Sequence, residues 1–277
     1  MIPYTLMSKI TFLINGIADA MVSPLDRGLH YGDGVFRTIR VINGQPVAWD
    51  EHYAKLADDS GRLKLPCPDA VVWRADLAQL FSDQGNGVAK LILTRGIAER
   101  GYAVTDHIQI TRIAIRSPLP LYPVQNATVG IRARLCNTRL SHQPLLAGIK
   151  HLNRLENVLA RQEWDDPTIS EGVMLDQDGL VVEGVMSNIL VRSGTMLMTP
   201  SLERCGVAGI TRQRILSMAP ALGLTPSITS LTLADLMDAD EVLMCNSLYG
   251  AWQVVNFNGR SWLPGQLASK LQLVLQE

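Results

Sequence analysis

The chain has 277 residues, which one large domain or two modest domains would fill, each with a buried core. Apolar residues make up 47% of it and charged residues 18%, against about 25% in an average soluble domain. The small charged fraction hints that another subunit covers part of the surface. The net charge is −1 and there is no long basic block, so we do not expect a nucleic-acid partner.

The four cysteines have no C-x-x-C pair and no histidine at ligand spacing, so we expect neither a disulfide framework nor a metal site. They are Cys67, Cys136, Cys205 and Cys245. The first 16 residues lack an apolar segment followed by a small-residue cleavage site. No apolar run approaches the ~18 residues of a membrane span. We therefore expect a soluble protein of the reducing cytoplasm, with no membrane partner.

The first half of the chain predicts strands, then helices, then strands. Two β-rich runs in the first 50 residues are broken at the turn dipeptides Asn15-Gly16 and Asn43-Gly44. The periodicity then predicts helices at 52–65 and 71–83, followed by strands at 88–96 and 108–116.

A proline-rich connector follows. Residues 117–123, SPLPLYP, contain three prolines, and each fixes its own φ and restricts the residue before it. We therefore predict an N-terminal α+β domain at 1–117, a linker at 118–123 and a C-terminal α/β domain at 124–277. The elements predicted for this last domain are strands at 127–135, 241–247 and 254–260, a strand meander over 172–200, and helices at 151–164, from about Thr211, and at 232–238.

The helix predicted at 151–164 raises a question about the lysine before it. Its apolar residues have the spacing of an amphipathic helix that faces a core: Leu152, Leu155, Val158 and Leu159. Lys150 would then stand at the helix N-terminus, where unpaired N–H groups and the macrodipole disfavour a cation. Either its side chain extends to solvent, or it serves as a neutral amine that attacks a carbonyl carbon.

Three other segments each allow a functional and a structural interpretation. In GVAGITRQRIL, 206–216, the glycines before Thr211 would offer backbone N–H groups to a phosphate, or the stretch is an ordinary loop with a threonine N-cap. Glu183 ends an apolar strand, where its carboxylate either faces solvent or is buried beside a cationic group. The stretch 29–38 lacks the third glycine of a dinucleotide fingerprint, and we interpret it as a tight turn.

Taken together, these groups match one cofactor. An amine for an aldehyde, a cradle for a phosphate and an acid for a pyridine nitrogen are the protein groups that pyridoxal 5′-phosphate requires. The order of motifs resembles the fold-type IV pyridoxal-phosphate enzymes, which include branched-chain and D-amino-acid aminotransferases and aminodeoxychorismate lyases. The resemblance runs from about Ile14 to Ser247 and covers DRGLHYGDGVF (26–36), EHYAKL (51–56), TRGIAERGY (94–102), AGIKHLNRLENVLA (147–160), EGVMSNI (183–189), GVAGITR (206–212) and CNS (245–247).

The resemblance implies a role for each matching position. Lys150 matches the family's Schiff-base lysine, and Glu183 matches the acid that pairs with the pyridinium nitrogen. Two further segments match those near the phosphate: Gly209, Ile210 and Thr211, then Asn246 and Ser247. Arg100 matches a position that binds the substrate carboxylate, often across a dimer interface. The rest of the substrate pocket is expected to include Tyr102, Tyr31, Phe36 and Arg154.

Two positions depart from the family pattern. The H-x-x-R-L motif, whose arginine contacts the phosphate, is HYAKL at 52–56 here, so Lys55 would supply a point charge without the bidentate fork of arginine. Phe36 stands where the D-amino-acid aminotransferases have tyrosine. Arg154 and the run Arg100-Gly101-Tyr102 resemble the lyase branch instead.

The resemblance implies a two-domain mixed α/β (α+β) subunit of fold type IV that works as a homodimer. It also implies a lyase that converts 4-amino-4-deoxychorismate to 4-aminobenzoate and pyruvate in folate biosynthesis. The alternative is an aminotransferase of branched-chain or D-amino acids that uses the same lysine. A third interpretation, motivated by Lys55, is a dimeric binding protein without cofactor chemistry, which would lack the yellow colour of a lysine-bound cofactor.

Overall fold

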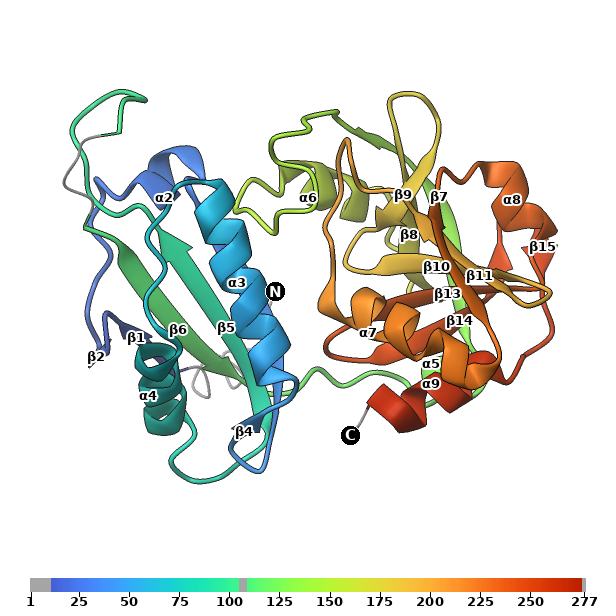
Figure 1. Ribbon diagram of the computed structural model, residues 1–277, viewed down its shortest axis with the longest axis horizontal. Helices are drawn as coiled ribbons and strands as arrows, with labels where there is room; N and C mark the ends of the chain where they lie inside the picture. Colours follow the sequence, from blue (N-terminus) through green and yellow to red (C-terminus); the bar gives the residue numbers. More distant parts are fainter. Residues whose placement is uncertain (1–10, 105–108, 276–277) are drawn as a thin grey trace. The chain divides into compact units, whose positions relative to one another are not determined.

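The computed structural model describes residues 11–104 and 109–275. Residues 1–10, which belong to the segment expected to hold no leader, and residue 108, the predicted start of a strand, lie outside the described residues. The chain divides into two compact units, shown in Figure 1. The first is Met1–Pro120 with Lys150–Asn153, and the second is Leu121–Ile149 with Arg154–Glu277.

The first unit is built on an antiparallel sheet with strand order β2-β1-β6-β5-β3-β4. Its strands are β1 (Thr11–Ile14), β2 (Ile17–Ala18), β3 (Gly34–Ile42), β4 (Gln45–Pro46), β5 (Gly87–Thr94) and β6 (Thr111–Ser117). Its helices are α2 (Arg27–Tyr31), α3 (Trp49–Arg62) and α4 (Ala70–Leu80). Because side chains alternate along a strand, Val35, Arg37 and Ile39 share the buried face that α3 covers, while Phe36 points to the opposite face.

Most elements of this unit agree with the sequence patterns. The helices α3 and α4 and the strands β5 and β6 lie within a few residues of their predicted ranges. The tight turn expected within 29–38 lies at Gly32 and Asp33, between the end of α2 and the start of β3. Between them, Gly32 caps α2 with a φ of 64°, a left-handed conformation that glycine adopts without a steric penalty.

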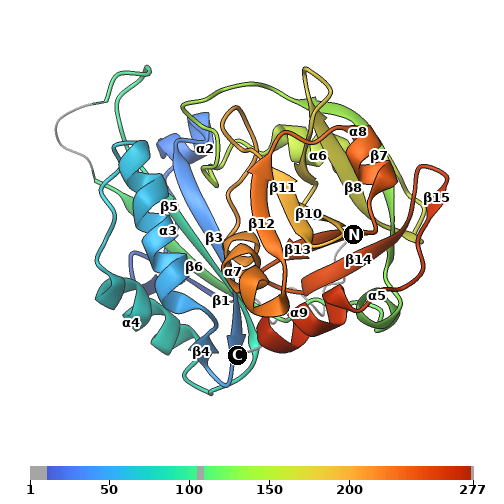
Figure 2. The same ribbon diagram turned by 45° about the vertical axis from the view of Figure 1, so that its right-hand side comes forward.

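The second unit is built on a mixed sheet of nine strands, in which β15 pairs with β14 and the others follow the order β12-β11-β10-β13-β14-β7-β8-β9. Its strands are β7 (Ile131–Leu140), β8 (Ile169–Asp176), β9 (Val181–Gly184), β10 (Asn188–Ser193), β11 (Met196–Pro200), β12 (Thr225–Thr229), β13 (Glu241–Asn246), β14 (Gly250–Phe257) and β15 (Arg260–Ser261). Its helices are α5 (Gln125–Thr128), α6 (Leu155–Arg161), α7 (Ile210–Met218), η1 (Ala219–Leu222, a 3₁₀-helix), α8 (Leu233–Asp238) and α9 (Leu267–Leu275). Figure 2 shows α7 and α9 side by side, where they bury Ile215 and Leu271 against Leu190 and Leu243 of the sheet.

Two predictions for this unit are wrong. The helix expected at 151–164 is only Leu155–Arg161, and Leu155, Val158 and Leu159 are 75%, 49% and 55% exposed rather than buried in the core. The strand expected from residue 127 begins at Ile131, after α5. Over the described ranges 11–104 and 109–275, we find no helix that is long and apolar enough to cross a membrane.

Candidate active site

Lys150 lies in an extended segment of the first unit. Its carbonyl oxygen accepts the N–H of Phe36 at 2.9 Å, and the N–H of Leu152 donates to the carbonyl of Gly34 at 3.0 Å, so the segment pairs with the edge of β3. The expectation that Lys150 stands at a helix N-terminus is wrong, because α6 begins only at Leu155. The Nζ of Lys150 lies 4.6 Å from the centroid of the Phe36 ring.

A second lysine approaches the same ring. The Nζ of Lys90, on β5, lies 5.2 Å from the centroid of Phe36. Lys90 pairs with Thr38 of β3 and therefore shares the sheet face to which Phe36 points. Lys90 was not among the predicted residues, although a cation within an apolar strand is a usable signal. The two ammonium groups make this face of the first unit attractive to carboxylates.

Lys55, the predicted phosphate contact, is engaged by two carboxylates of α3. Its Nζ lies 2.8 Å from Oδ2 of Asp58 and 2.5 Å from Oδ1 of Asp59. Burial lowers the pKa of Lys55, while the hydrogen bond and charge of Asp58 act in the opposite direction. With two carboxylates at its ammonium group, Lys55 presents little net positive charge to a phosphate.

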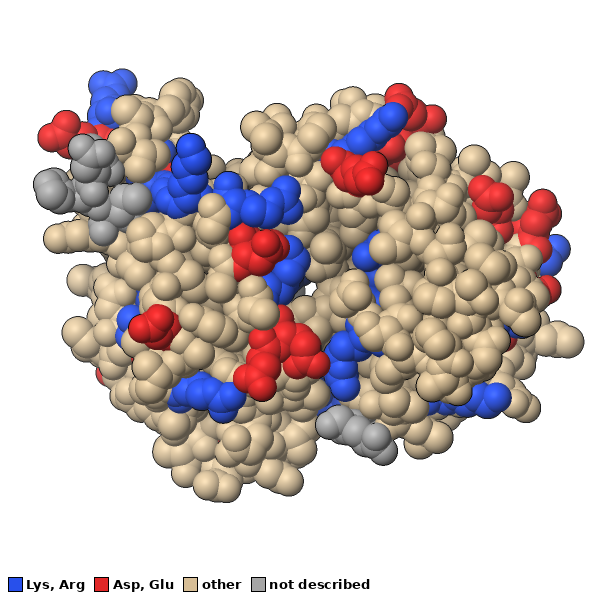
Figure 3. Space-filling view, in the orientation of Figure 1, with Lys and Arg blue, Asp and Glu red and all other residues tan. Residues whose placement is uncertain are grey.

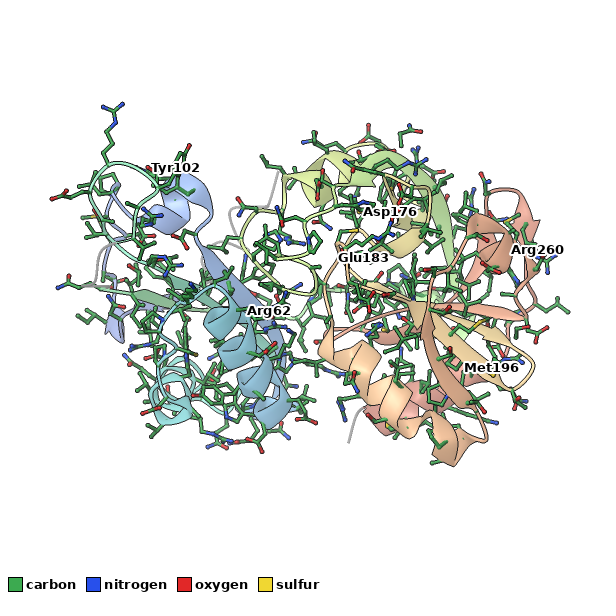
Figure 4. The ribbon with its side chains drawn as sticks, turned by 45° about the horizontal axis from the view of Figure 1, so that its top comes forward. Arg62, Tyr102, Asp176, Glu183, Met196 and Arg260 are labelled. Atoms are coloured by element: carbon green, nitrogen blue, oxygen red, sulfur yellow. The ribbon has the colours of Figure 1, made fainter. Side chains whose placement is uncertain are left out.

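Glu183 belongs to β9 and is buried in the second unit, where Figure 4 labels it. Its Oε2 accepts the N–H of Val207 at 2.8 Å. Glu183 is only 3% exposed, which excludes the alternative in which its carboxylate faces solvent. Arg154 is partly buried, and desolvation lowers the pKa of its guanidinium while the charge of Glu183 opposes that change. Arg154 is therefore within electrostatic reach of the Glu183 carboxylate.

The turn before α7 is the predicted phosphate cradle. Gly209 is the N-cap residue, and within the described part of the chain no side chain caps the helix, so the N–H groups of its first turn remain available. The hydroxyl oxygens of Thr211 and Ser247 lie 3.4 Å apart beside that turn. Asn188, which the sequence analysis did not single out, holds the turn by accepting the N–H of Gly209 at 3.1 Å and donating to the carbonyl of Val207 at 2.8 Å.

Asn246 shapes the second segment. Its Oδ1 accepts the N–H groups of Leu248 at 2.9 Å and Tyr249 at 3.1 Å, and its Nδ2 donates to the carbonyl of Met186 at 3.2 Å. These bonds use both polar atoms of the amide, so Asn246 orders the turn that presents Ser247.

Arg100 and Tyr102 lie on an exposed loop of the first unit, and Tyr102 is 83% exposed. The ring centroid of Tyr102 is 5.2 Å from that of Tyr31, which belongs to α2. Figure 4 labels Tyr102 beside this helix. Arg27 anchors the loop by donating to the carbonyls of Gly101 at 2.9 Å and Tyr102 at 3.2 Å. The loop is therefore fixed by its backbone while its polar side chains stay exposed.

The predicted residues fall into two groups. The second unit brings together Glu183, Arg154, Gly209, Ile210, Thr211, Asn246 and Ser247. The first unit carries Lys150, Lys55, Phe36, Tyr31, Arg100 and Tyr102.

Three potential metal ligands that are distant in sequence also meet in the second unit. The ligand atoms of His142, Asp176 and Cys205 all lie within 4.8 Å of one another. The Nε2 of His142 is 3.0 Å from Oδ2 of Asp176, whose Oδ1 accepts the N–H groups of Asp178 and Leu180. These hydrogen bonds account for the His142–Asp176 pair, and we interpret the cluster as a support for the turn that joins β8 and β9.

The buried thiols provide a test of the packing of the second unit. Burial raises the pKa of Cys136, Cys205 and Cys245 to about 12 each, so at pH 8 only about one thiol in 10⁴ at these positions is the reactive thiolate. We expect a thiol reagent to modify the half-buried Cys67 first in the folded protein, and all four cysteines in guanidinium. Rapid reaction of two or more thiols in the folded state would contradict this packing.

Comparisons with known proteins agree with these features. The model of the family described as amino-transferase class IV matches residues 34–257. Aminodeoxychorismate lyase of Vibrio harveyi is 36% identical over 86% of this chain and 88% of its own length. D-alanine aminotransferase of Bacillus licheniformis is 29% identical over 91% of this chain and 89% of its own.

A solved structure extends the likeness to three dimensions. The crystal structure of 4-amino-4-deoxychorismate lyase from Pseudomonas aeruginosa superposes with a TM-score of 0.92 at 44% identity, covering 96% of this chain and 98% of that one. The mixed α/β architecture is thus that of the fold-type IV enzymes, as the resemblance implied. The chain belongs to the class IV aminotransferase family.

Proposed function

We propose that this protein is a pyridoxal-phosphate-dependent lyase that converts 4-amino-4-deoxychorismate to 4-aminobenzoate and pyruvate. One observation carries the proposal. The buried carboxylate of Glu183 accepts the N–H of Val207, and the same segment, 206–211, continues into the uncapped first turn of α7. The choice of a lyase is supported by the identities of 36% and 44% to the Vibrio and Pseudomonas lyases, over most of each chain.

The residues present fit pyridoxal phosphate. The first turn of α7 and the hydroxyls of Thr211 and Ser247 would hold the phosphate, and the Glu183 carboxylate would face the pyridine nitrogen. Lys150 would hold the aldehyde carbon through its amine. We place the phosphate on α7 rather than on Lys55, because Asp58 and Asp59 neutralise that ammonium. When bound, the cofactor withdraws electrons from the carbon that bears the substrate amine.

The chain's own residues would supply the proton transfers. The Nζ of Lys150, as a neutral amine, removes the proton from the amine-bearing ring carbon. As an ammonium group, it then donates a proton to the departing enolpyruvyl oxygen, and elimination makes the ring aromatic. Glu183 keeps a negative charge beside the pyridine nitrogen, which favours a proton on that nitrogen. Lys90 and Arg100 are suited to the two carboxylates of the substrate, with Tyr31, Tyr102, Phe36 and Arg154 as further pocket residues.

The first experiment is a measurement of pyruvate release from aminodeoxychorismate, with pyridoxal phosphate supplied and no keto acid present. We expect release in proportion to enzyme concentration. An absence of release from a yellow protein would reject the lyase, and the yellow colour would still establish cofactor binding.

The second candidate is an aminotransferase of branched-chain or D-amino acids. It is favoured by the D-alanine aminotransferase already described and by a putative branched-chain aminotransferase of Methanocaldococcus jannaschii, which is 31% identical over 87% of this chain and 84% of its own. An aminotransferase would accumulate pyridoxamine phosphate when an amino acid is added alone. D-alanine and the branched-chain amino acids are the substrates to compare.

The exposed loop supports a prediction about Arg100. Replacement of Arg100 by alanine removes a charged partner of the substrate carboxylate, and hydrogen bonds to charged groups contribute about 1.5–3 kcal/mol. We expect kcat/KM to fall by roughly 10- to 100-fold, mostly through KM. Steady-state kinetics would show this, with Glu99→Gln on the same exposed loop as a control. An unchanged KM in Arg100→Ala would remove Arg100 from the substrate site.

We also propose a homodimer, acting in the reducing cytoplasm where four free cysteines persist. Each unit exposes large apolar side chains that a partner would cover: Leu145 and Leu155 are 80% and 75% exposed, and Met21 and Leu29 are 91% and 69% exposed. On the face shown in Figure 3, most atoms belong to uncharged residues, in line with the low charged fraction of the chain. Light scattering on the purified protein would give the mass, and a monomer at micromolar concentration would contradict the proposal.

A further inference from the structure

A buried charged cluster contacts the main chain of Lys150. The Oδ2 of Asp59 accepts the N–H of Lys150 at 3.1 Å, and the same oxygen is paired with the guanidinium of Arg37. The other oxygen, Oδ1, lies 2.5 Å from the Nζ of Lys55. The Asp59 side chain has 0% exposure and that of Arg37 has 3%.

Local structure explains how these groups meet. Lys55 and Asp59 are one turn apart on α3, so they share one face of the helix. Arg37 is on the side of β3 that α3 covers. The segment Lys150–Leu152 pairs with the edge of that same strand. All four participants belong to the first unit.

This charged cluster stabilises the core less than apolar side chains would. Removing a carboxylate and a guanidinium from water costs several kcal/mol for each ion, and apolar side chains of similar volume often stabilise a core as well or better. Burial lowers the pKa of Arg37 to about 10, which shows how strongly the site is desolvated. The feature that an apolar replacement would not reproduce is a charged acceptor for the N–H of Lys150.

The chemistry proposed for Lys150 explains why such an acceptor is useful. During each turnover its side chain would exchange a bond to the cofactor for a role in proton transfer, so the side chain cannot hold the residue in register. The main chain must be held by contacts that persist throughout the cycle. The N–H of Lys150 bonds to Asp59 and its carbonyl to Phe36, so both of its backbone polar groups are anchored independently of the Nζ.

We propose that Asp59 is a positioning residue for Lys150, with Arg37 and Lys55 holding its carboxylate in place. This inference rests on the catalytic role of Lys150 in the proposed function. It assigns Lys55 to the support of the lysine segment instead of the phosphate. Asp59 acts through the backbone of Lys150 and touches neither substrate nor cofactor.

The test compares Asp59→Ala and Asp59→Asn with Asp58→Asn in the holoenzyme. Asp58 pairs with Lys55 from a side chain that is 57% exposed, so its variant removes an ion pair without removing the acceptor for Lys150. For Asp59→Ala we expect kcat to fall by roughly 10- to 100-fold with KM within about threefold. The asparagine retains an acceptor oxygen and should recover part of the loss, and Asp58→Asn should stay within about twofold of the wild type.

Two readouts separate positioning from a general loss of stability. Amide hydrogen exchange of a peptide that contains Lys150 should accelerate in Asp59→Ala, and it should be unchanged in Asp58→Asn. The midpoint of the pH-dependent visible absorbance of the bound cofactor should also move in Asp59→Ala, because the Nζ is less well placed. The exchange measurement can be made without substrate or cofactor, so it stands even if the proposed reaction is rejected.

Wild-type exchange at Lys150 and an unshifted absorbance midpoint in Asp59→Ala would overturn the proposal. So would an equal fall of kcat in Asp58→Asn and Asp59→Asn. If Asp59→Ala does not fold, the comparison of Asp59→Asn with Asp58→Asn decides the question by the same measurements.

Discussion

Replacement of Lys150 by alanine is expected to reduce pyruvate release by roughly 10²- to 10⁴-fold, the range that a positioned general acid–base group contributes. The variant would lose the amine that we propose holds the cofactor and moves the proton. The change shortens a half-buried side chain whose backbone remains bonded to Asp59 and Phe36, so the thermal midpoint should change little. The rate is measured by coupling pyruvate release to its reduction.

A matched control is Lys270→Ala, which removes an exposed lysine from α9 in the second unit. This variant should keep the wild-type rate. Full activity in Lys150→Ala would reject Lys150 as the catalytic lysine and with it the mechanism. Loss of the yellow colour together with the rate would show that cofactor attachment also depends on this amine.

Glu183→Gln is expected to have the second largest effect, a fall in kcat of roughly 10²- to 10³-fold, as for the loss of one preorganised electrostatic contact. The glutamine keeps the shape and can still accept the N–H of Val207, but it has no negative charge to hold a proton on the pyridine nitrogen. The fold-change in kcat should therefore exceed the fold-change in the affinity for pyridoxal phosphate. Rates measured at increasing concentrations of pyridoxal phosphate give both quantities.

A second buried carboxylate provides the control for Glu183. Glu241 of β13 is 6% exposed and forms an ion pair of 2.8 Å with Arg192. Glu241→Gln should lower the thermal midpoint by weakening that partly buried pair while leaving kcat unchanged. Equal losses of kcat in the two variants would mean that Glu183 acts through folding alone.

The sequence alone determined much of the local structure and the family. The periodicity located α3, α4, β5 and β6, because each of these elements has a regular apolar pattern and ends at a turn. The motif order indicated the class IV family, which the comparisons confirm. The glycine turn before α7 was recognisable because a helix N-terminus is a local feature of the chain.

Long-range contacts decided the rest. Leu152, Leu155, Val158 and Leu159 have a helical period, yet residues 150–152 pair with β3, and α6 starts late with its apolar side chains exposed. A pattern of 3.6 residues indicates an apolar face but not the partner that covers it. Likewise, nothing within α3 distinguishes Asp59 from the neighbouring Asp58. Only the packing of α3 on β3 buries Asp59 beside Arg37 and the Lys150 backbone, because burial and pairing depend on residues that the folded chain brings together.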